Sequence, residues 1–168
     1  AGSIPVVGDW NGDGKDEVGI YQYGVWYLDY NGNGAFDPGT DRIFAWGWPT
    51  STPVVGDWNG DGKDEVGIYH NGVWYLDYNG NGAFDAGTDR IFGWGWSTST
   101  PVVGDWNGDG KDEVGVFHNG DWYLDYNGNG AFDAGTDRIF GWGWSTSKPM
   151  VGDWNNDGKA EVGIFQDG

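Results

Sequence analysis

The sequence predicts an all-β fold, and within that class a β-propeller whose four-stranded blades are each 48 residues long. The first observation is a repeat with this period, which is visible in Pro5, Pro53, Pro101 and Pro149. The second is that each period contains four short runs of β-branched and aromatic residues and no helical periodicity. A repeat of this kind buries its apolar faces only by stacking, so each blade needs its neighbours.

Four strands are expected in the first period, at residues 4–9, 17–21, 25–29 and 41–48. Pro5 suits only the start or the edge of a sheet strand. In the second strand, Val18 and Ile20 share one face, and Gly19 leaves room for a close neighbour on the other face. A tight turn is expected at residues 22–24, where the later copies carry Asn-Gly, a strong hairpin signal.

The whole chain, residues 1–168, is predicted to form a single repeat domain. The predicted blades are residues 5–52, 53–100 and 101–148, followed by a half-blade at 149–168. Propellers usually have four to eight blades. Three arrangements therefore remain open: a segment of a longer protein, a chain that closes alone, or a homodimer in which two copies complete a seven-bladed ring.

Composition restricts the core and the partners. The chain contains 34 Gly but also 13 Trp, 9 Tyr and 8 Phe, so the predicted core is aromatic. It has no Cys, which excludes a disulfide framework and a thiolate metal site. The net charge of -18, from 26 acidic and 8 basic residues, excludes nucleic acid as an expected partner. No apolar run approaches the ~20 residues of a membrane span.

One acidic loop recurs in every period and has the spacing of a calcium loop. At residues 9–17, oxygen-bearing side chains stand at alternate positions and a glycine stands sixth. Ca²⁺ takes six to eight oxygen ligands, and an EF-hand loop supplies them with this spacing. An EF-hand has a bidentate Glu at its twelfth position, but here that position is Ile20, within an expected strand. We therefore expect a nine-residue calcium loop inside a β-hairpin.

The predicted ligands of these first-type loops are side chains at positions 1, 3, 5 and 9 and the carbonyl at position 7. They are Asp9, Asn11, Asp13, Lys15 and Glu17; Asp57, Asn59, Asp61, Lys63 and Glu65; Asp105, Asn107, Asp109, Lys111 and Glu113; Asp153, Asn155, Asp157, Lys159 and Glu161. The eighth position is Asp in three copies and Ala160 in the last, which indicates that it is not an indispensable ligand.

A second-type loop lies between the third and fourth strands of each full blade, with donors at the same positions and Gly again sixth. Its predicted ligands are Asp29, Asn31, Asn33, Ala35 and Asp37; Asp77, Asn79, Asn81, Ala83 and Asp85; Asp125, Asn127, Asn129, Ala131 and Asp133. The fifth position carries Asn in place of a carboxylate, which predicts weaker binding. Up to one Ca²⁺ is expected per loop, seven in all.

The remaining candidate ligand-binding residues are aromatic. Trp and Tyr faces stack on sugar rings, or they fill the core between blades. The tryptophans concerned are Trp46, Trp48, Trp94, Trp96, Trp142 and Trp144. His70 and His118 are expected to be exposed turn residues. No enzyme is predicted, because every candidate pair of carboxylates is repeated, and arrays of identical sites suit binding or structure.

Residues 8–19, Gly-Asp-Trp-Asn-Gly-Asp-Gly-Lys-Asp-Glu-Val-Gly, resemble the FG-GAP or VCBS-type repeat, whose members include the propeller head of integrin α subunits. The resemblance implies a propeller in which this loop lies between the first two strands of a blade and binds Ca²⁺. It implies Asp9, Asn11, Asp13 and Glu17 as ligands. The family usually has Asp at the ninth position, so Asp16 is an alternative donor to Glu17.

These observations lead to an expected function. The chain is predicted to be a calcium-stabilised, extracellular or cell-surface propeller that acts in adhesion, recognition or structure. Extracellular calcium is near millimolar and would fill even weak sites. The alternative is a carbohydrate-binding lectin that uses Trp/Tyr pockets between blades.

Overall fold

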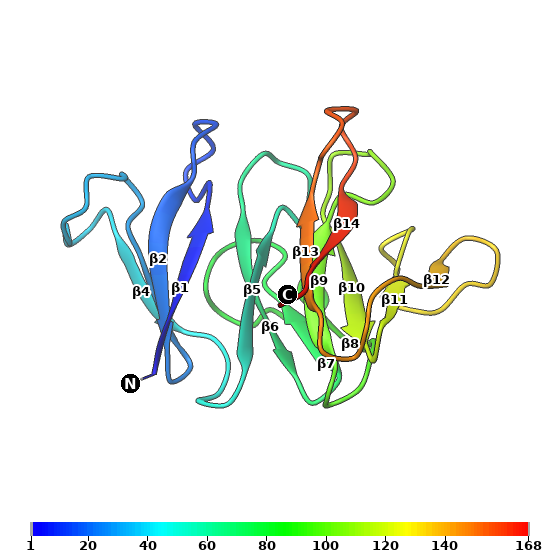
Figure 1. Ribbon diagram of the computed structural model, residues 1–168. Helices are drawn as coiled ribbons and strands as arrows, with labels where there is room; N and C mark the ends of the chain where they lie inside the picture. The colour runs from blue at the N-terminus through cyan, green and yellow to red at the C-terminus, as the bar shows by residue number, and fades with distance from the viewer. Residues whose placement is uncertain (1, 168) are drawn as a thin grey trace. The chain divides into compact units, whose positions relative to one another are not determined.

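The computed structural model describes residues 2–167 and confirms the predicted all-β class, with blade-like antiparallel sheets in tandem (Figure 1). Within those residues no helix is long and apolar enough to cross a membrane. The strands are β1 (Ser3–Gly8), β2 (Glu17–Gln22), β3 (Val25–Leu28), β4 (Arg42–Ala45), β5 (Thr52–Gly56), β6 (Glu65–His70), β7 (Val73–Leu76), β8 (Arg90–Gly93), β9 (Thr100–Gly104), β10 (Glu113–His118), β11 (Asp121–Leu124), β12 (Arg138–Gly141), β13 (Lys148–Gly152) and β14 (Glu161–Phe165).

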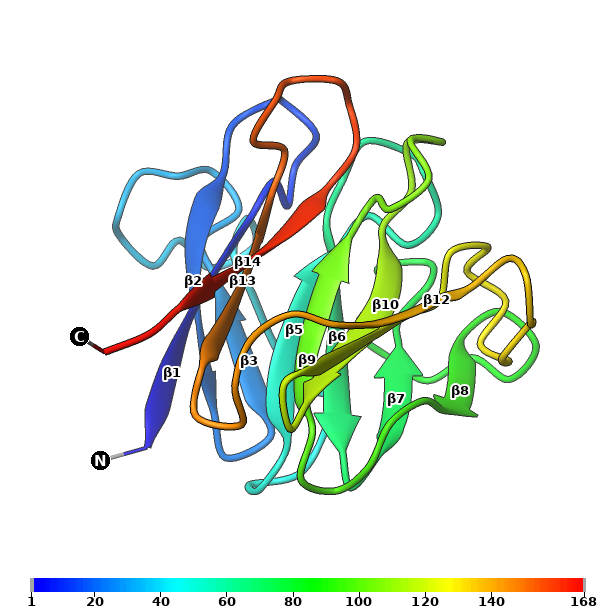
Figure 2. The same cartoon turned by 45° about the vertical axis from the view of Figure 1, so that its right-hand side comes forward.

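The strands form three four-stranded sheets, in the orders β1-β2-β3-β4, β5-β6-β7-β8 and β9-β10-β11-β12, and one two-stranded sheet, β13-β14. Each order follows the chain, as it does in a propeller blade. The chain divides into two compact units. The first comprises the chain up to residue 70 together with 74–91, and the second comprises 71–73 and the chain from 92 onward. Figure 2 gives a second view of the hairpins that make up each sheet.

Local sequence explains two features of the four-stranded sheets. A Cβ on Gly19 would lie 2.7 Å from Leu28 Cδ2 and 2.9 Å from Val6 Cγ2, so the predicted close approach at this glycine is present. Asn71 and Gly72 have φ values of 53° and 88°. Two successive positive φ values are what a two-residue type I′ hairpin turn requires, and Asn-Gly adopts them most easily.

The fourth strand is shorter than the predicted 41–48, because β4 ends at Ala45. Trp46 N still donates to Gly24 O at 2.9 Å, but Gly47 then takes a φ of 112° and the chain turns away. A tight turn follows, in which Ser51 N donates to Trp48 O at 2.9 Å. The two tryptophans at this corner therefore lie beyond the strand.

Aromatic side chains fill the core of each unit. In the first unit, Trp10 and Trp26 are fully buried and belong to one cluster with Val66 and Ile68 from the next sheet. The second unit repeats this arrangement, with Trp106, Trp122 and Phe117 packed against Val162 and Ile164. Large aromatic surfaces thus replace the aliphatic residues that the sequence lacks.

Candidate metal centres

The first-type loop joins β1 to β2 and is folded around the side chain of its first residue. Gly12 N donates to Asp9 Oδ1 at 2.7 Å, Asp13 N to the same oxygen at 3.1 Å, and Gly14 N to Asp9 Oδ2 at 2.8 Å. Gly12 and Gly14 have φ values of 80° and 83°, which glycine adopts without steric cost. The glycines therefore allow the amides to surround one carboxylate.

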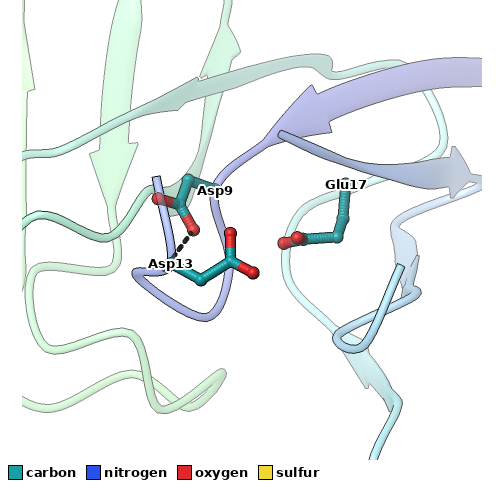
Figure 3. A group of neighbouring side chains, drawn as sticks. All are labelled: Asp9, Asp13 and Glu17. Atoms are coloured by element: carbon teal, nitrogen blue, oxygen red, sulfur yellow. Dashed lines mark hydrogen bonds between the residues drawn. The ribbon is translucent and has the colours of Figure 1, made fainter. Parts of the chain in front are cut away.

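Three carboxylates converge in this loop. Asp9, Asp13 and Glu17 each offer one oxygen, and these oxygens all lie within 4.8 Å of one another (Figure 3). Ca²⁺–O distances are about 2.3–2.6 Å, so two ligands of one ion stand at most about 5 Å apart. The donor set therefore fits a single calcium ion. The same convergence occurs in Asp57, Asp61 and Glu65, in Asp105, Asp109 and Glu113, and in Asp153, Asp157 and Glu161.

The ninth residue, at the start of the return strand, is the buried member of the cluster. Glu17 is only 6% exposed. In the second copy, Glu65 Oε2 accepts Trp58 N at 3.1 Å, and Glu65 Oε1 accepts Asn59 Nδ2 at 2.8 Å. Asp16, the alternative donor, is exposed and is not in the cluster. The structure thus brings Glu17 together with the two aspartates.

Burial and like charge make these glutamates difficult to ionise in the metal-free protein. Burial, followed by the charges of Asp61 and Asp57, raises the pKa of Glu65 to about 8. Burial likewise raises the pKa of Glu113 to about 8, with Asp109 and Asp105 adding to it. The pKa of Glu17 is raised by burial and by Asp13. A divalent cation held by the three oxygens would remove this repulsion.

The other predicted donors of the loop have supporting contacts. Asn11 Nδ2 donates to Tyr30 O at 3.0 Å, which ties the first-type loop to the second-type loop of the same blade. Because the amide nitrogen is used in this way, Oδ1 is the atom that remains for a cation. Lys15 N donates to Asp13 Oδ1 at 3.0 Å, so the backbone at the seventh position orients the fifth residue.

The second-type loop has a different internal structure. Asp37 Oδ2 accepts the Nδ2 groups of both Asn31 and Asn33. The amide oxygens of these asparagines accept backbone N–H groups, from Asn33 at 3.1 Å and from Ala35 at 2.7 Å. The two asparagine bonds lower the pKa of Asp37, and the equivalent bonds lower the pKa of Asp85 and of Asp133. This loop closes through its own amide donors.

One oxygen in the second-type loops fits a cation nevertheless. Asp77 is 1% exposed, and its Oδ2 accepts Gly82 N at 2.7 Å, but its Oδ1 is buried without a hydrogen-bond partner. Asp29 Oδ1 is in the same situation. Burial raises the pKa of Asp77. The second-type loop therefore offers a cation one unpartnered carboxylate oxygen, at position 1. The amide nitrogens of its two asparagines donate to the carboxylate at position 9.

An aspartate that braces the second-type loop was not among the predicted site residues. Asp41 Oδ1 accepts Tyr30 N at 3.0 Å and Asp41 Oδ2 accepts Asp37 N at 2.6 Å, so one carboxylate joins both ends of the loop. Asp89 and Asp137 make the same pair of bonds in the later copies. The signal was present in the sequence, because an Asp recurs four residues after each of these loops.

A comparison with protein families agrees with this architecture. The model of the FG-GAP-like repeat matches residues 9–68 and 66–116, which is more than half of the chain and includes three of the four first-type loops. The chain belongs to the FG-GAP-like repeat family. The predicted family resemblance is thereby confirmed. A search of curated proteins gave no match.

Two aromatic hollows occur at equivalent places in this FG-GAP-like repeat protein, one in each unit. The first has a volume of about 320 Å³ and is lined by Trp46, Trp48, Tyr75, Phe84 and Ile91, among others; the second has a volume of about 310 Å³ and is lined by Trp94, Trp96, Tyr123, Phe132 and Ile139. Trp46 and Trp94 are buried, whereas Trp48 is 46% and Trp96 is 48% exposed. Trp142 and Trp144 are also exposed.

The prediction that His70 and His118 are exposed turn residues is wrong. Both lie at the end of a strand and are half-buried. The ring of His70 lies 5.1 Å from that of Trp48, and the ring of His118 stacks on Trp96 at 4.7 Å. The tryptophan after the fourth strand reaches across to the next hairpin and covers the imidazole, which the local turn sequence does not reveal.

Proposed function

We propose that this chain is a calcium-stabilised FG-GAP-like repeat module that works at the cell surface or outside the cell, in adhesion, recognition or structural support and without catalysis. The observation that carries the proposal is the convergence of three carboxylate oxygens in each of four first-type loops, with one buried glutamate per cluster in the first three copies. Clusters of this kind, in a chain of net charge -18, are destabilised without a counter-ion.

The repetition of the clusters supports a structural use of the metal. Each of the four holds the same residue types in the same positions, whereas catalysis needs one asymmetric site with distinct roles. Each loop also joins two strands of a sheet, so a cation held there fixes a hairpin. The extracellular placement is supported by calcium supply, because modules outside the cell can work even with weak calcium sites of about 10⁻⁴–10⁻³ M.

Thermal unfolding tests this function. A cation at about 100 times its dissociation constant adds roughly 2.7 kcal/mol per site. With four sites, calcium at that excess over its dissociation constant should raise the melting temperature by roughly 20 °C or more over the same protein in excess chelator. Magnesium at equal concentration, the control, should give a much smaller rise, because Mg²⁺ demands a tighter octahedral site. Superimposable melting curves in calcium and chelator would refute the proposal.

A second candidate function is carbohydrate binding. It is supported by the two equivalent hollows, in which Trp48 and Trp96 each present about half of their surface to solvent. An exposed indole face beside a Tyr ring suits the apolar face of a sugar. Both residues would act in the same way, giving two sites per chain.

A glycan array on the calcium-loaded protein tests this candidate. Binding to one class of sugar should be lost in a Trp48→Ala, Trp96→Ala double variant and retained in Phe36→Ala, which removes an exposed aromatic ring outside both hollows. Equal binding by both variants, or no binding by the unmodified protein, would contradict the candidate.

A further inference from the structure

Successive first-type loops in the first unit are joined by a pair of hydrogen bonds that the ligand pattern does not explain. Asp64, the eighth residue of the second loop, contacts Asp9, the first residue of the first loop. Asp9 N donates to Asp64 Oδ2 at 2.8 Å, and Asp64 N donates to Asp9 O at 2.9 Å. Both backbone polar groups of a predicted ligand residue are therefore held by one residue 55 positions away.

Packing shows that this contact has a dedicated place. Asp64 is half-buried, and a Cβ on Gly8 would lie 2.9 Å from Asp64 Oδ2 and 2.8 Å from Val55 Cγ1. A side chain at position 8 would therefore crowd both the Asp64 carboxylate and Val55. Asp16, at the equivalent place in the first loop, is exposed instead.

The second unit contains half of the same contact. There Ala160 N donates to Asp105 O at 2.8 Å, so the backbone bond is retained. The methyl group of Ala160 has no acceptor for the amide of Asp105. The two units therefore differ by one carboxylate at equivalent positions, and the second serves as an internal comparison for the first.

We infer that Asp64 is a positioning residue that couples calcium binding in the first loop to calcium binding in the second. Asp64 lies between Lys63, which would offer its carbonyl, and the ligand Glu65. A cation in the second loop fixes both flanking residues and thereby fixes Asp64. Asp64 in turn fixes the backbone of Asp9, whose side chain is the centre of the first loop. This inference rests on the proposed calcium function.

The test is a calcium titration in which amide NMR signals of Gly14 and Gly62 report the two loops separately. Asp61→Asn removes one carboxylate of the second loop. In the otherwise unmodified protein it should weaken calcium binding in the first loop about tenfold, within the usual range of coupling between sites. In an Asp64→Ala background, Asp61→Asn should leave the affinity of the first loop unchanged.

Three further variants separate positioning from general stability. Asp64→Asn retains an acceptor for Asp9 N and should preserve most of the coupling. Asp16→Ala, the matched control, should not alter it. In the unmodified protein, the third and fourth first-type loops are expected to bind calcium nearly independently. Ala160→Asp should couple calcium binding in these two loops.

Hydrogen exchange of the metal-free protein gives a readout without calcium. The amide of Asp9 should exchange faster in Asp64→Ala and at the unmodified rate in Asp64→Asn. If Asp61→Asn weakens calcium binding in the first loop equally with Asp64 present and with Asp64→Ala, the coupling is overturned and the proposed function stands. Loops that bind no calcium would overturn both the coupling and the proposed function.

Discussion

The first-type and second-type loops share their spacing and their sixth-position glycine, yet they handle charge in opposite ways. In the first type, three carboxylates face one another, and the buried glutamates have raised pKa values, about 8 for Glu65 and Glu113. In the second type, two asparagine amides donate to one aspartate and lower the pKa of Asp37, Asp85 and Asp133.

The difference teaches that oxygen spacing alone does not define a metal site. Among the side-chain donors the loops differ at two positions, Asp against Asn at position 5 and Glu against Asp at position 9. The change at position 5 replaces a repelling oxygen with an N–H donor. A first-type loop therefore stores electrostatic repulsion that a cation can release, whereas a second-type loop is already closed by hydrogen bonds. We expect strong calcium binding in the four first-type loops and weaker binding in the three second-type loops.

The largest expected effect is a fall in the stability of the metal-free protein as pH rises. Glu65 and Glu113 have folded-state pKa values of about 8, against 4.5 when solvated. Between these values the folded state holds more protons than the unfolded state, so the free energy of unfolding must decrease with pH. Urea unfolding of the metal-stripped protein from pH 5 to pH 8.5 measures this decrease in the free energy of unfolding.

The control for this prediction is the Glu65→Gln, Glu113→Gln double variant, whose stability should vary much less over the same range. Stability that rises from pH 5 to pH 8 in the unmodified protein would mean that the glutamates are ionised without cost, and the contrast between the loops would fail.

The next effect is at Glu65, where one substitution should change stability in opposite directions in the metal-free and the calcium-loaded protein. Glu65→Gln should stabilise the metal-free protein at pH 8.5, since it removes a buried charge, but it should abolish the roughly 2.7 kcal/mol that a well-filled site contributes. Chemical unfolding in calcium and in chelator gives both values. Glu161→Gln, at the half-exposed fourth copy, is the matched control and should stabilise the metal-free protein less.

A smaller effect is expected when a second-type loop is given the first-type pattern. Asn81→Asp adds a third carboxylate to Asp77 and Asp85 and removes one amide donor. Calcium affinity at this loop should rise about tenfold, since affinity depends on ligand charge, while the metal-free protein loses stability. Asn81→Ala should also lose stability but gain no affinity. Isothermal titration calorimetry distinguishes the two.

The smallest effect belongs to the acid of the second-type loop. Asp85→Asn weakens the acceptor for Asn79 and Asn81 and should lower the stability of the metal-free protein slightly, in contrast to Glu65→Gln. The measurement is a thermal melt in chelator. A stabilised Asp85→Asn variant would show that the two loop types do not differ in the way described.

Much of the fold was predictable because it is encoded locally and repeated. Asn71-Gly72 predicts its turn from backbone preference alone, and Gly19 predicts a close approach that a side chain would prevent. The spacing of Asp9 and Asp13 places two oxygens on one loop, and the convergence of Glu17 with them agrees with the expected hairpin.

The remaining features depend on contacts distant in sequence. Asp64 and Asp9 are 55 residues apart, and neither local sequence indicates the bond between them. The cover that Trp48 provides for His70 requires knowing where the chain turns after β4. The choice of Glu17 over Asp16 depends on which residue of a strand start faces inward, and the spacing allowed both. The homodimer ring stays a prediction, and light scattering in solution would test it.

The most direct test of the central claim is the position of calcium in crystals grown in millimolar calcium, located by anomalous scattering. The account predicts peaks between the carboxylates of Asp9, Asp13 and Glu17 and at the three equivalent clusters, each stronger than any peak in a second-type loop. Empty first-type loops beside filled second-type loops would contradict it.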